Sequence, residues 1–375
     1  MSAKKEGLNR RDFLKVAGAT SATMAVSWSL GSKVSEAQTG GSLTIRQDWI
    51  HGGHHAAMWV ALDKGWYAEK GLTVGIVRGF GSADTAKLIG IGKEQMGQCD
   101  AGAVILAQLR GTKQRIVGSY IPIAPYCFVS PREKGIKTPK DLEGKTVAVS
   151  AASGEYTVWP AFVKKTGINA NAITLNTVSV DMLNTQLLTG KVDAVMTYAI
   201  SGVALAKINN LPINVLMFKN HGVDLYSNSL TVHTPWLEEK GNEELLRRFL
   251  EATYRGLKYA LLNPQEAMAI VAKRNPDSII GEKEQRFQLE RLRLWAASNI
   301  TPENKNFGLG YISEEKMRYT NDVVTEYMHK GPETKLTLDK IYTNKYLPES
   351  MVKLSPAEWQ KVNELYQDYV QLLGI

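Results

Sequence analysis

Short apolar segments with the spacing of β-strands alternate with helical segments in two series along this chain. The first series runs from the strand at 43–45 to the strand at 115–120, and the second runs from 146–149 to 215–218. Alternation at this rhythm favours largely parallel sheets that are covered by helices. From Pro235 onward the apolar spacing becomes mostly helical. The pattern therefore predicts an α/β protein.

The two series predict two α/β lobes that face each other across a cleft. In open α/β sheets, ligands bind outside the carboxyl ends of the strands, so the cleft is the expected binding site. Closure of two such lobes would enclose a small molecule and exclude water. We expect residues 38–129 and 228–375 to form lobe one, with the C-terminal helices packed on it, and residues 130–227 to form lobe two.

The N-terminal segment has the pattern of a twin-arginine export signal. Arg10-Arg11-Asp12-Phe13-Leu14-Lys15 precedes a mildly apolar stretch at 16–30, which is too short and too polar to span a membrane. Ser35-Glu36-Ala37 is a small-x-small cleavage site, so we expect the signal peptide to cover residues 1–37 and to be removed. No cysteine follows the stretch, so no lipid anchor is expected. The alternative is an ordinary N-terminal helix with two exposed arginines. The prediction is a periplasmic protein exported by the twin-arginine translocase.

The charge balance argues against a nucleic-acid partner. The chain has 45 Lys and Arg against 37 Asp and Glu, a net charge of +8. Six of these basic residues and three of the acidic ones lie in 1–37, which leaves 39 basic and 34 acidic residues, a net charge of +5. The excess is spread out, with no basic run interleaved with aromatics. Cys99 and Cys127 lie in apolar, strand-like segments, which favours free buried thiols over a disulfide.

Two longer motifs resemble the periplasmic substrate-binding proteins of ABC importers. They are Met-Trp-Val-Ala-Leu-Asp-Lys-Gly-Trp-Tyr-Ala-Glu-Lys-Gly-Leu at 58–72 and Lys-Thr-Pro-Lys-Asp-Leu-Glu-Gly-Lys at 137–145. Asp48-Trp49 and His55 also match. The chain is most similar to the group that serves thiamine-pyrimidine precursors. Its relatives include sulfonate-, taurine- and nitrate-binding proteins and the fungal hydroxymethylpyrimidine phosphate synthase, and the similarity extends from about residue 43 to about residue 327.

This resemblance implies a type II periplasmic binding fold and a monomer that delivers a small-molecule solute to an inner-membrane ABC permease. The fungal synthase differs in having a cysteine-rich stretch, where this chain has Ser229-Leu230-Thr231-Val232. The synthase also uses a pyridoxal cofactor, to which an exported protein would have little access. We therefore predict a binding protein without a cofactor rather than an enzyme.

Lobe one offers three candidate ligand contacts near its first strand and two at later strand ends. Trp49 follows a strand and resembles the family aromatic that stacks on a flat ligand, although a core or rim tryptophan is the alternative. His54 and His55 belong to a His-Gly-Gly-His-His loop; we expect a hydrogen bond to an organic ligand, with a metal site or solvent exposure as alternatives. Ser82 could donate to an anionic ligand group or cap a helix. Asp100 could pair with a ligand amino group or cap the helix at 101–109.

Lobe two offers three candidates at its own strand ends. Glu155 could accept a hydrogen bond from a ligand amine, or could simply be stabilised at a helix N-terminus. Tyr156 could close an aromatic sandwich with Trp49. Tyr198 ends the strand at 192–197 and is a further candidate.

These aromatic and acidic residues favour a planar, nitrogen-containing solute such as a pyrimidine. A sulfonate or nitrate would require Arg, Lys or clustered amides, and among the strand-end loops considered only Arg78 offers a cation. The prediction is a solute-binding protein for a pyrimidine-like ligand, with no metal. The alternatives are a sulfonate, taurine or nitrate binder, an enzyme of the pyrimidine-synthase type, and a metal-binding protein that uses the histidine loop.

Overall fold

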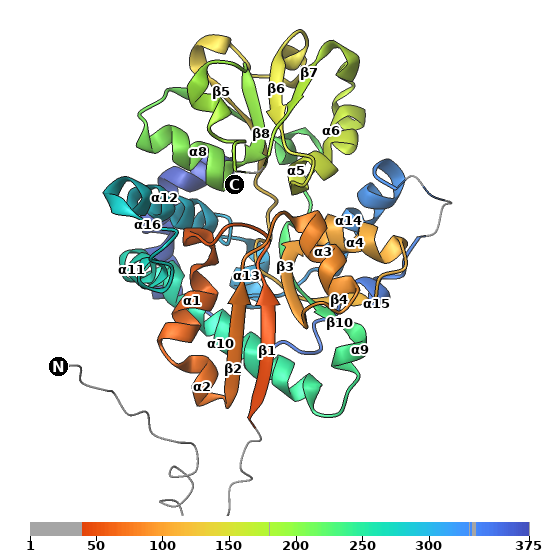
Figure 1. Ribbon diagram of the computed structural model, residues 1–375, viewed down its shortest axis with the longest axis vertical. Helices are drawn as coiled ribbons and strands as arrows, with labels where there is room; N and C mark the ends of the chain where they lie inside the picture. The colour runs from red at the N-terminus through yellow and green to blue at the C-terminus, as the bar shows by residue number, and fades with distance from the viewer. Residues whose placement is uncertain (1–39, 180, 330, 332–334, 375) are drawn as a thin grey trace, which may run out of the picture. The chain divides into compact units, whose positions relative to one another are not determined.

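Two five-stranded sheets form the framework of the computed structural model, which describes residues 40–179, 181–329, 331 and 335–374 (Figure 1). The predicted signal peptide at 1–37 and its cleavage site lie outside the described residues. Within the described part of the chain, every helix is too short or too polar to span a lipid bilayer.

The first sheet has the strand order β2-β1-β3-β10-β4. Its strands are β1 Gly41–Arg46, β2 Leu72–Val77, β3 Met96–Asp100, β4 Gln114–Ser119 and β10 Asn228–His233. Strand β1 runs parallel to β2 and β3, whereas β10 is antiparallel to β3 and β4. The sheet is therefore a parallel core into which one late strand is inserted in the opposite direction.

The second sheet has the order β7-β6-β8-β5-β9, which repeats the plan of the first. Its strands are β5 Tyr126–Pro131, β6 Thr146–Val149, β7 Thr174–Thr177, β8 Ala194–Tyr198 and β9 Ile213–Met217. Here β5 is the antiparallel strand, and it is the first strand after the chain arrives from the other sheet. The two-lobed α/β architecture expected from the alternation is confirmed.

The helices follow the same division along the chain. Those of the first series are α1 Ala56–Asp63, α2 Trp66–Glu69, α3 Ser82–Gly90 and α4 Ala101–Leu109. Those of the second series are α5 Gly154–Thr157, α6 Trp159–Thr166, α7 Gln186–Thr189 and α8 Ala199–Ile208. After β10 come α9 Thr234–Leu237, α10 Asn242–Leu262, α11 Pro264–Arg274, α12 Gly281–Ala297, α13 Pro302–Asn306, α14 Glu314–Tyr327, α15 Leu338–Ile341 and α16 Pro356–Leu373. Short 3-10 turns are η1 Gly53–His55, η2 Arg132–Lys134, η3 Pro139–Leu142, η4 Ala170–Ala172 and η5 Phe218–His221.

The C-terminal helices pack chiefly on lobe one, by which we mean the first sheet and its helices. Helices α10 and α11 pack on α1, α14 packs on α4, and α16 packs on α10 and α12. Helix α10 buries Leu246, Phe249, Leu250 and Leu257, a spacing that places them on one face. Each such side chain contributes roughly 1.5–3 kcal/mol when fully buried. Helix α12 contacts η1 in lobe one and packs extensively on α8 beside the second sheet, while α14 and α16 reach the second lobe through smaller contacts with α6 and β9.

The chain passes between the sheets twice, and both passages lie near the predicted boundaries. The first occurs between Ser119 and Tyr126, and the second occurs between His221 and Asn228. The predicted boundary at 129/130 lies inside β5, which pairs entirely with strands of the second sheet. The division into lobes at particular residues stays a prediction. Cys99 and Cys127 are free, buried thiols.

Candidate ligand-binding site

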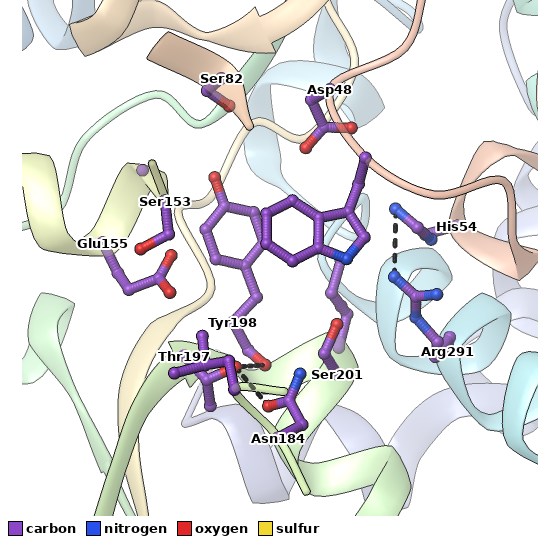
Figure 2. A pocket seen from close by; sticks show the side chains of 14 residues that line it. Asp48, His54, Ser82, Ser153, Glu155, Asn184, Thr197, Tyr198, Ser201 and Arg291 are labelled. Atoms are coloured by element: carbon purple, nitrogen blue, oxygen red, sulfur yellow. Dashed lines mark hydrogen bonds between the residues drawn. The ribbon is translucent and has the colours of Figure 1, made fainter. Parts of the chain in front are cut away.

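A small cavity lies where the carboxyl ends of strands from the two sheets approach each other (Figure 2). The first sheet and α12 contribute Asp48, Trp49, His54, Ser82 and Arg291 to its lining. The second sheet and its loops contribute Ser153, Gly154, Glu155, Leu183, Asn184, Thr197, Tyr198, Ile200 and Ser201. The cavity volume is about 30 Å³, room for a water molecule but not for a six-membered ring. A ring could enter only if the lobes or the lining side chains move apart.

Glycines hold the backbone around Trp49. A Cβ atom at Gly79 would overlap the backbone of Gln47 and Asp48, so only glycine allows the two loops to approach this closely. Gly81 has a φ of 120°, and its N–H donates to the carbonyl oxygen of Asp48 at 2.8 Å. The half-buried Trp49 is thereby fixed at the end of β1, where it lines the cavity as predicted.

The glycine pair of the histidine loop serves close packing on α12. A Cβ atom at Gly53 would overlap the carbonyl oxygen of Gln288, and one at Gly52 would lie 2.7 Å from Nη1 of Arg291. The N–H of Gly53 donates to Oε1 of Gln288 at 2.9 Å. This packing places His54 beside Arg291, whose Nη2 lies 3.4 Å from Nε2 of His54.

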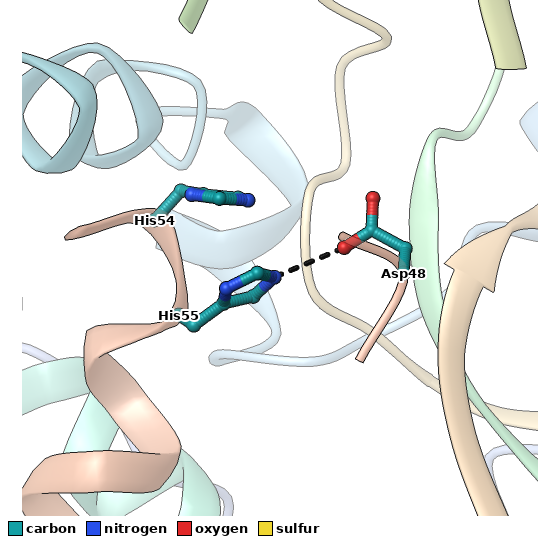
Figure 3. A group of neighbouring side chains, drawn as sticks. All are labelled: Asp48, His54 and His55. Carbon is teal, nitrogen blue, oxygen red and sulfur yellow. Dashed lines mark hydrogen bonds and ion pairs between the residues drawn. The ribbon is translucent and has the colours of Figure 1, made fainter. Parts of the chain in front are cut away.

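His54, His55 and Asp48 form a buried cluster under the cavity (Figure 3). His55 does not line the cavity; its Nε2 lies 3.0 Å from Oδ1 of Asp48, and its ring stacks against His54 with centroids 3.7 Å apart. Burial lowers the pKa of both histidines, and the neighbouring Arg291 lowers that of His54 further. Both rings are therefore neutral near pH 7.

The same three residues could supply ligands to a metal ion, because their donor atoms lie within 4.8 Å of one another. Two features oppose this use. Nε2 of His55 is already bonded to Asp48, and the Arg291 guanidinium next to His54 would repel a cation. The third histidine of the motif, His51, bonds Gln47 at 2.6 Å and does not line the cavity.

Glu155 supplies the acidic wall on the lobe-two side. Its side chain is 2% exposed, and burial raises its pKa from 4.5 to about 8, so the carboxyl group carries a proton at neutral pH. A protonated carboxyl group can donate one hydrogen bond and accept another. The site residue is thus a neutral acid rather than the carboxylate expected from the sequence.

Asp100 lies behind the cavity wall and takes neither of the two roles expected from the sequence. Its Oδ2 accepts a short hydrogen bond from the Tyr198 hydroxyl, and its Oδ1 accepts one from Ser227 at 2.7 Å. The side chain does not cap α4. Burial raises its pKa from 3.8 to about 6. Because Tyr198 ends β8 and Asp100 ends β3, this bond joins the two sheets. Ser82 lines the cavity at the start of α3, and its Oγ accepts from the Asp100 N–H at 3.2 Å.

The structure does not bring Tyr156 to the cavity. Tyr156 is half-buried and packs against a hydrophobic cluster to which both lobes contribute residues, so no sandwich with Trp49 forms. Adjacent residues of a helix point about 100° apart, and in the four-residue α5 it is Glu155 that faces the cavity. Tyr198, the weaker candidate, is the lobe-two aromatic that lines it.

Arg291 is the lining cation that sequence reasoning missed; other lining residues that it did not select as contacts include Asp48, Ser153, Asn184, Thr197 and Ser201. Arg291 lies on α12, far along the chain from every strand end, and only its burial reveals it: the residue is 4% exposed. Nη1 donates to Oε1 of Gln288 at 3.2 Å, while Nε has no partner. Burial lowers its pKa from 12.5 to about 10, so the guanidinium stays charged at neutral pH.

An outer cleft of about 580 Å³ adjoins the cavity. The two share Trp49, Asn184, Ser201 and Arg291. Its other walls include the apolar side chains of Ile50, Leu205, Ile208, Ile280 and Phe287. The four shared residues therefore mark the mouth through which the cavity opens to this cleft.

Comparison with known proteins identifies the N-terminal signal and the family. Residues 7–27 match the twin-arginine translocation pathway signal sequence, so the protein is exported from the cytoplasm, as predicted. Residues 53–267, more than half of the chain, match the protein family described as NMT1/THI5 like.

Two curated relatives share distant sequence similarity with most of the chain. The formylaminopyrimidine-binding protein of Halalkalibacterium halodurans is 25% identical over 61% of this chain and 69% of its own length. The riboflavin-binding protein RibY of Chloroflexus aurantiacus is 23% identical over 82% of this chain and 86% of its own length.

Solved structures show the same fold at lower identity. The periplasmic aliphatic sulphonate binding protein SsuA from Escherichia coli superposes with a TM-score of 0.60 over 82% of this chain and 99% of that chain, at 15% identity. The predicted type II periplasmic binding fold is confirmed, and with it the resemblance noted in the sequence motifs. Because the family match covers more than half of the chain, this chain belongs to the NMT1/THI5-like family of substrate-binding proteins.

Proposed function

We propose that this protein is the solute-binding component of an ABC importer that captures a planar, nitrogen-containing solute of the pyrimidine type. It acts as a monomer in the periplasm and delivers the solute to an inner-membrane permease. The observation that carries the proposal is the pairing of two aromatic side chains, Trp49 and Tyr198, with the buried acid Glu155 around one cavity between the sheets.

The chemistry of this lining suits a heteroaromatic amine. A ring that enters between the lobes can rest against Trp49, where aromatic contact is worth about 0.5–1.5 kcal/mol beyond area burial. The protonated Glu155 can donate to a ring nitrogen and accept from an adjacent amino group, which is the donor–acceptor pattern of an aminopyrimidine. The names of the two relatives specify formylaminopyrimidine and riboflavin as what they bind. Both compounds are nitrogen heterocycles, which supports a planar, nitrogen-containing solute.

Capture requires an opening step, because the cavity is smaller than any ring. Opening must break the hydrogen bond between Tyr198 and Asp100, which joins the two sheets. Closure around the solute then excludes water from the ring and from Glu155. The bound solute thereby stabilises the closed form that the permease would recognise.

Thermal-shift and calorimetric titrations test the proposal. The probes are 4-amino-5-hydroxymethyl-2-methylpyrimidine, riboflavin, taurine and nitrate, with the mature protein. We expect a heterocycle to stabilise the protein, by about 2.7 kcal/mol at a concentration of 100 Kd. The variants Trp49→Ala and Glu155→Leu should each weaken that binding, whereas Glu155→Gln, which keeps a neutral donor and an acceptor, should weaken it less. A response to taurine or nitrate with none to the heterocycles would contradict the ligand class.

An enzymatic role predicts a different outcome in the same samples. The family includes enzymes as well as binding proteins. We expect mass spectrometry to recover the heterocycle unchanged after prolonged incubation with the protein. Steady conversion of the heterocycle would contradict the transport proposal.

A further inference from the structure

We propose that the solute carries an oxyanion, a carboxylate, sulfonate or phosphate group, that Arg291 binds at the mouth of the cavity. This inference rests on the proposed function and deepens it, because it specifies the substituent on the heterocycle. The solute would then present its ring nitrogens to Glu155 and its oxyanion to Arg291.

The first support is that Arg291 is a buried cation without a paired anion. Among the residues that the structure describes, no carboxylate lies within 4.0 Å of its guanidinium, although many exposed cations of this chain are paired. Asp48 and Glu284 are the acids whose charges favour the charged form of Arg291, and Asp48 is already bonded to His55. A buried, unpaired charge is costly, and proteins usually pair such a group with a ligand or a counter-ion.

The second support is that neighbouring side chains hold the guanidinium in place. Glu284 accepts from Nε2 of Gln288 at 2.7 Å, and Oε1 of Gln288 accepts from both Gly53 and Arg291. The guanidinium also lies 5.5 Å from the ring centre of Phe287. Protein contacts therefore orient the guanidinium group through Nη1 and Nη2, whereas Nε has no hydrogen-bond partner. A preorganised fork of this kind binds carboxylate, sulfonate or phosphate oxygens in a bidentate manner.

The third support is the position of Arg291. It lines both the inner cavity and the outer cleft, so a group bound to it would lie where the two meet. Figure 2 shows Glu155 and Arg291 at opposite sides of the cavity. The outer cleft, at about 580 Å³, offers the room for a substituent that the inner cavity lacks. Helix α12 contacts both lobes, so an anion held there would also favour closure.

A matched pair of ligands isolates the oxyanion: 4-amino-5-hydroxymethyl-2-methylpyrimidine and its phosphate monoester, measured by calorimetry. In the wild-type protein the phosphate should bind at least about tenfold more tightly than the alcohol, because it would add charge-assisted hydrogen bonds to the guanidinium group. Arg291→Met should abolish that preference and change the affinity for the alcohol far less. Arg291→Lys should retain part of it, because lysine keeps the charge but not the fork.

Arg293→Met is the control on the same helix, since Arg293 pairs with Glu290 and does not line the cavity. It should leave the preference for the phosphate unchanged. The unliganded Arg291→Met protein should melt at or above the wild-type temperature, because the substitution removes a buried, unpaired charge. That result would show that any lost binding does not come from unfolding.

Benzyl phosphate, which lacks the heterocycle, separates this inference from the proposed function. If neither pyrimidine binds but benzyl phosphate binds and the response disappears in Arg291→Met, the proposed function fails and the oxyanion site stands. If the alcohol binds as tightly as its phosphate, or if Arg291→Met keeps the preference, the oxyanion site is overturned while the pyrimidine proposal survives. If none of the three probes shows a response that depends on Arg291, the inference is likewise overturned.

Discussion

The two sheets share one strand order but present opposite chemistry to the cavity between them. Lobe one supplies one neutral histidine, His54, the carboxyl group of Asp48 and a buried cation, Arg291, which α12 brings in from the C-terminal part of the chain. Lobe two supplies a protonated acid, Glu155, from the short helix α5 that follows β6. A shared topology therefore determines where a binding site forms, whereas local packing determines which charges reach it.

The acidic wall of lobe two should produce the largest effect, which is a dependence of stability on pH. The pKa of Glu155 is about 8 in the folded protein and 4.5 in the unfolded chain, so protonation of this residue stabilises the fold. The stabilisation is complete below pH 4.5 and is lost as the pH rises through about 8. The difference in unfolding free energy between wild type and Glu155→Gln should therefore shift by on the order of 3 kcal/mol between pH 5 and pH 8, in favour of the variant at the higher pH. Urea unfolding at both pH values measures this.

Comparison with the variant is needed because the buried histidines act in the opposite direction. Their lowered pKa values make the protein more stable as the pH rises towards neutrality. Both proteins contain these histidines, so the difference between their unfolding free energies cancels the histidine contribution. Equal pH profiles for the two proteins would mean that Glu155 is ionised in the fold and that the two walls are less different than proposed.

The wall of lobe one should depend on the glycines that let η1 approach α12. Gly53→Ala would place a Cβ atom against the backbone carbonyl of Gln288, which cannot move without shifting the helix. We expect a loss of about 2 kcal/mol in unfolding free energy, measured by urea denaturation. Gly102→Ala is the control, because its Cβ would meet only ordinary contacts in α4, and it should be neutral or slightly stabilising. Comparable losses in both variants would count against this packing argument.

The contact between the lobes should be sensitive to Gly154. An added Cβ there would overlap Oδ2 of Asp100 and lie 2.7 Å from the Tyr198 hydroxyl. Because the obstructing atom ends a side chain, Gly154→Ala should leave folding nearly intact but hinder closure, and lower heterocycle affinity by about tenfold. Scattering should report a larger radius of gyration for the variant. Wild-type affinity together with wild-type dimensions would show that closure tolerates the extra methyl group.

The smallest expected effect is that of zinc on the histidine cluster. The Arg291 guanidinium beside His54 should repel the ion, so Zn²⁺ should not raise the melting temperature of the wild-type protein. Elemental analysis of the purified protein provides an independent measurement. Stoichiometric zinc in the wild-type protein that is absent from His55→Ala would show that the cluster of Asp48, His54 and His55 binds a metal ion, and would contradict this prediction.

Strand ends were predictable because their geometry follows from local periodicity. Trp49, Ser82 and Tyr198 all reach the cavity. Trp49 follows β1, Tyr198 ends β8, and Ser82 begins the helix that follows β2. Tyr156 shows the limit of that reasoning. It is next to Glu155 in the sequence, but the phase of a single helical turn decides which of the two faces the cavity, and the sequence does not specify that phase.

Long-range packing explains the remaining differences. The sequence suggested that Asp100 binds a ligand or caps a helix, yet its partners are Tyr198 and Ser227, which come from distant parts of the chain. Arg291 lies in a helix rich in charged residues, and every other charged residue of that helix is exposed or only partly buried. Nothing in its neighbourhood along the chain distinguishes it from Arg293.

The sequence by itself determined the export signal, the family and the alternation of strands and helices, because each of these is encoded in contiguous residues. Only the tertiary structure decided which charged groups are buried together, since burial depends on elements that meet from opposite ends of the chain. The pairing of a protonated acid with an unpaired guanidinium across one cavity is a property of that packing, and desolvation gives both groups their altered pKa values.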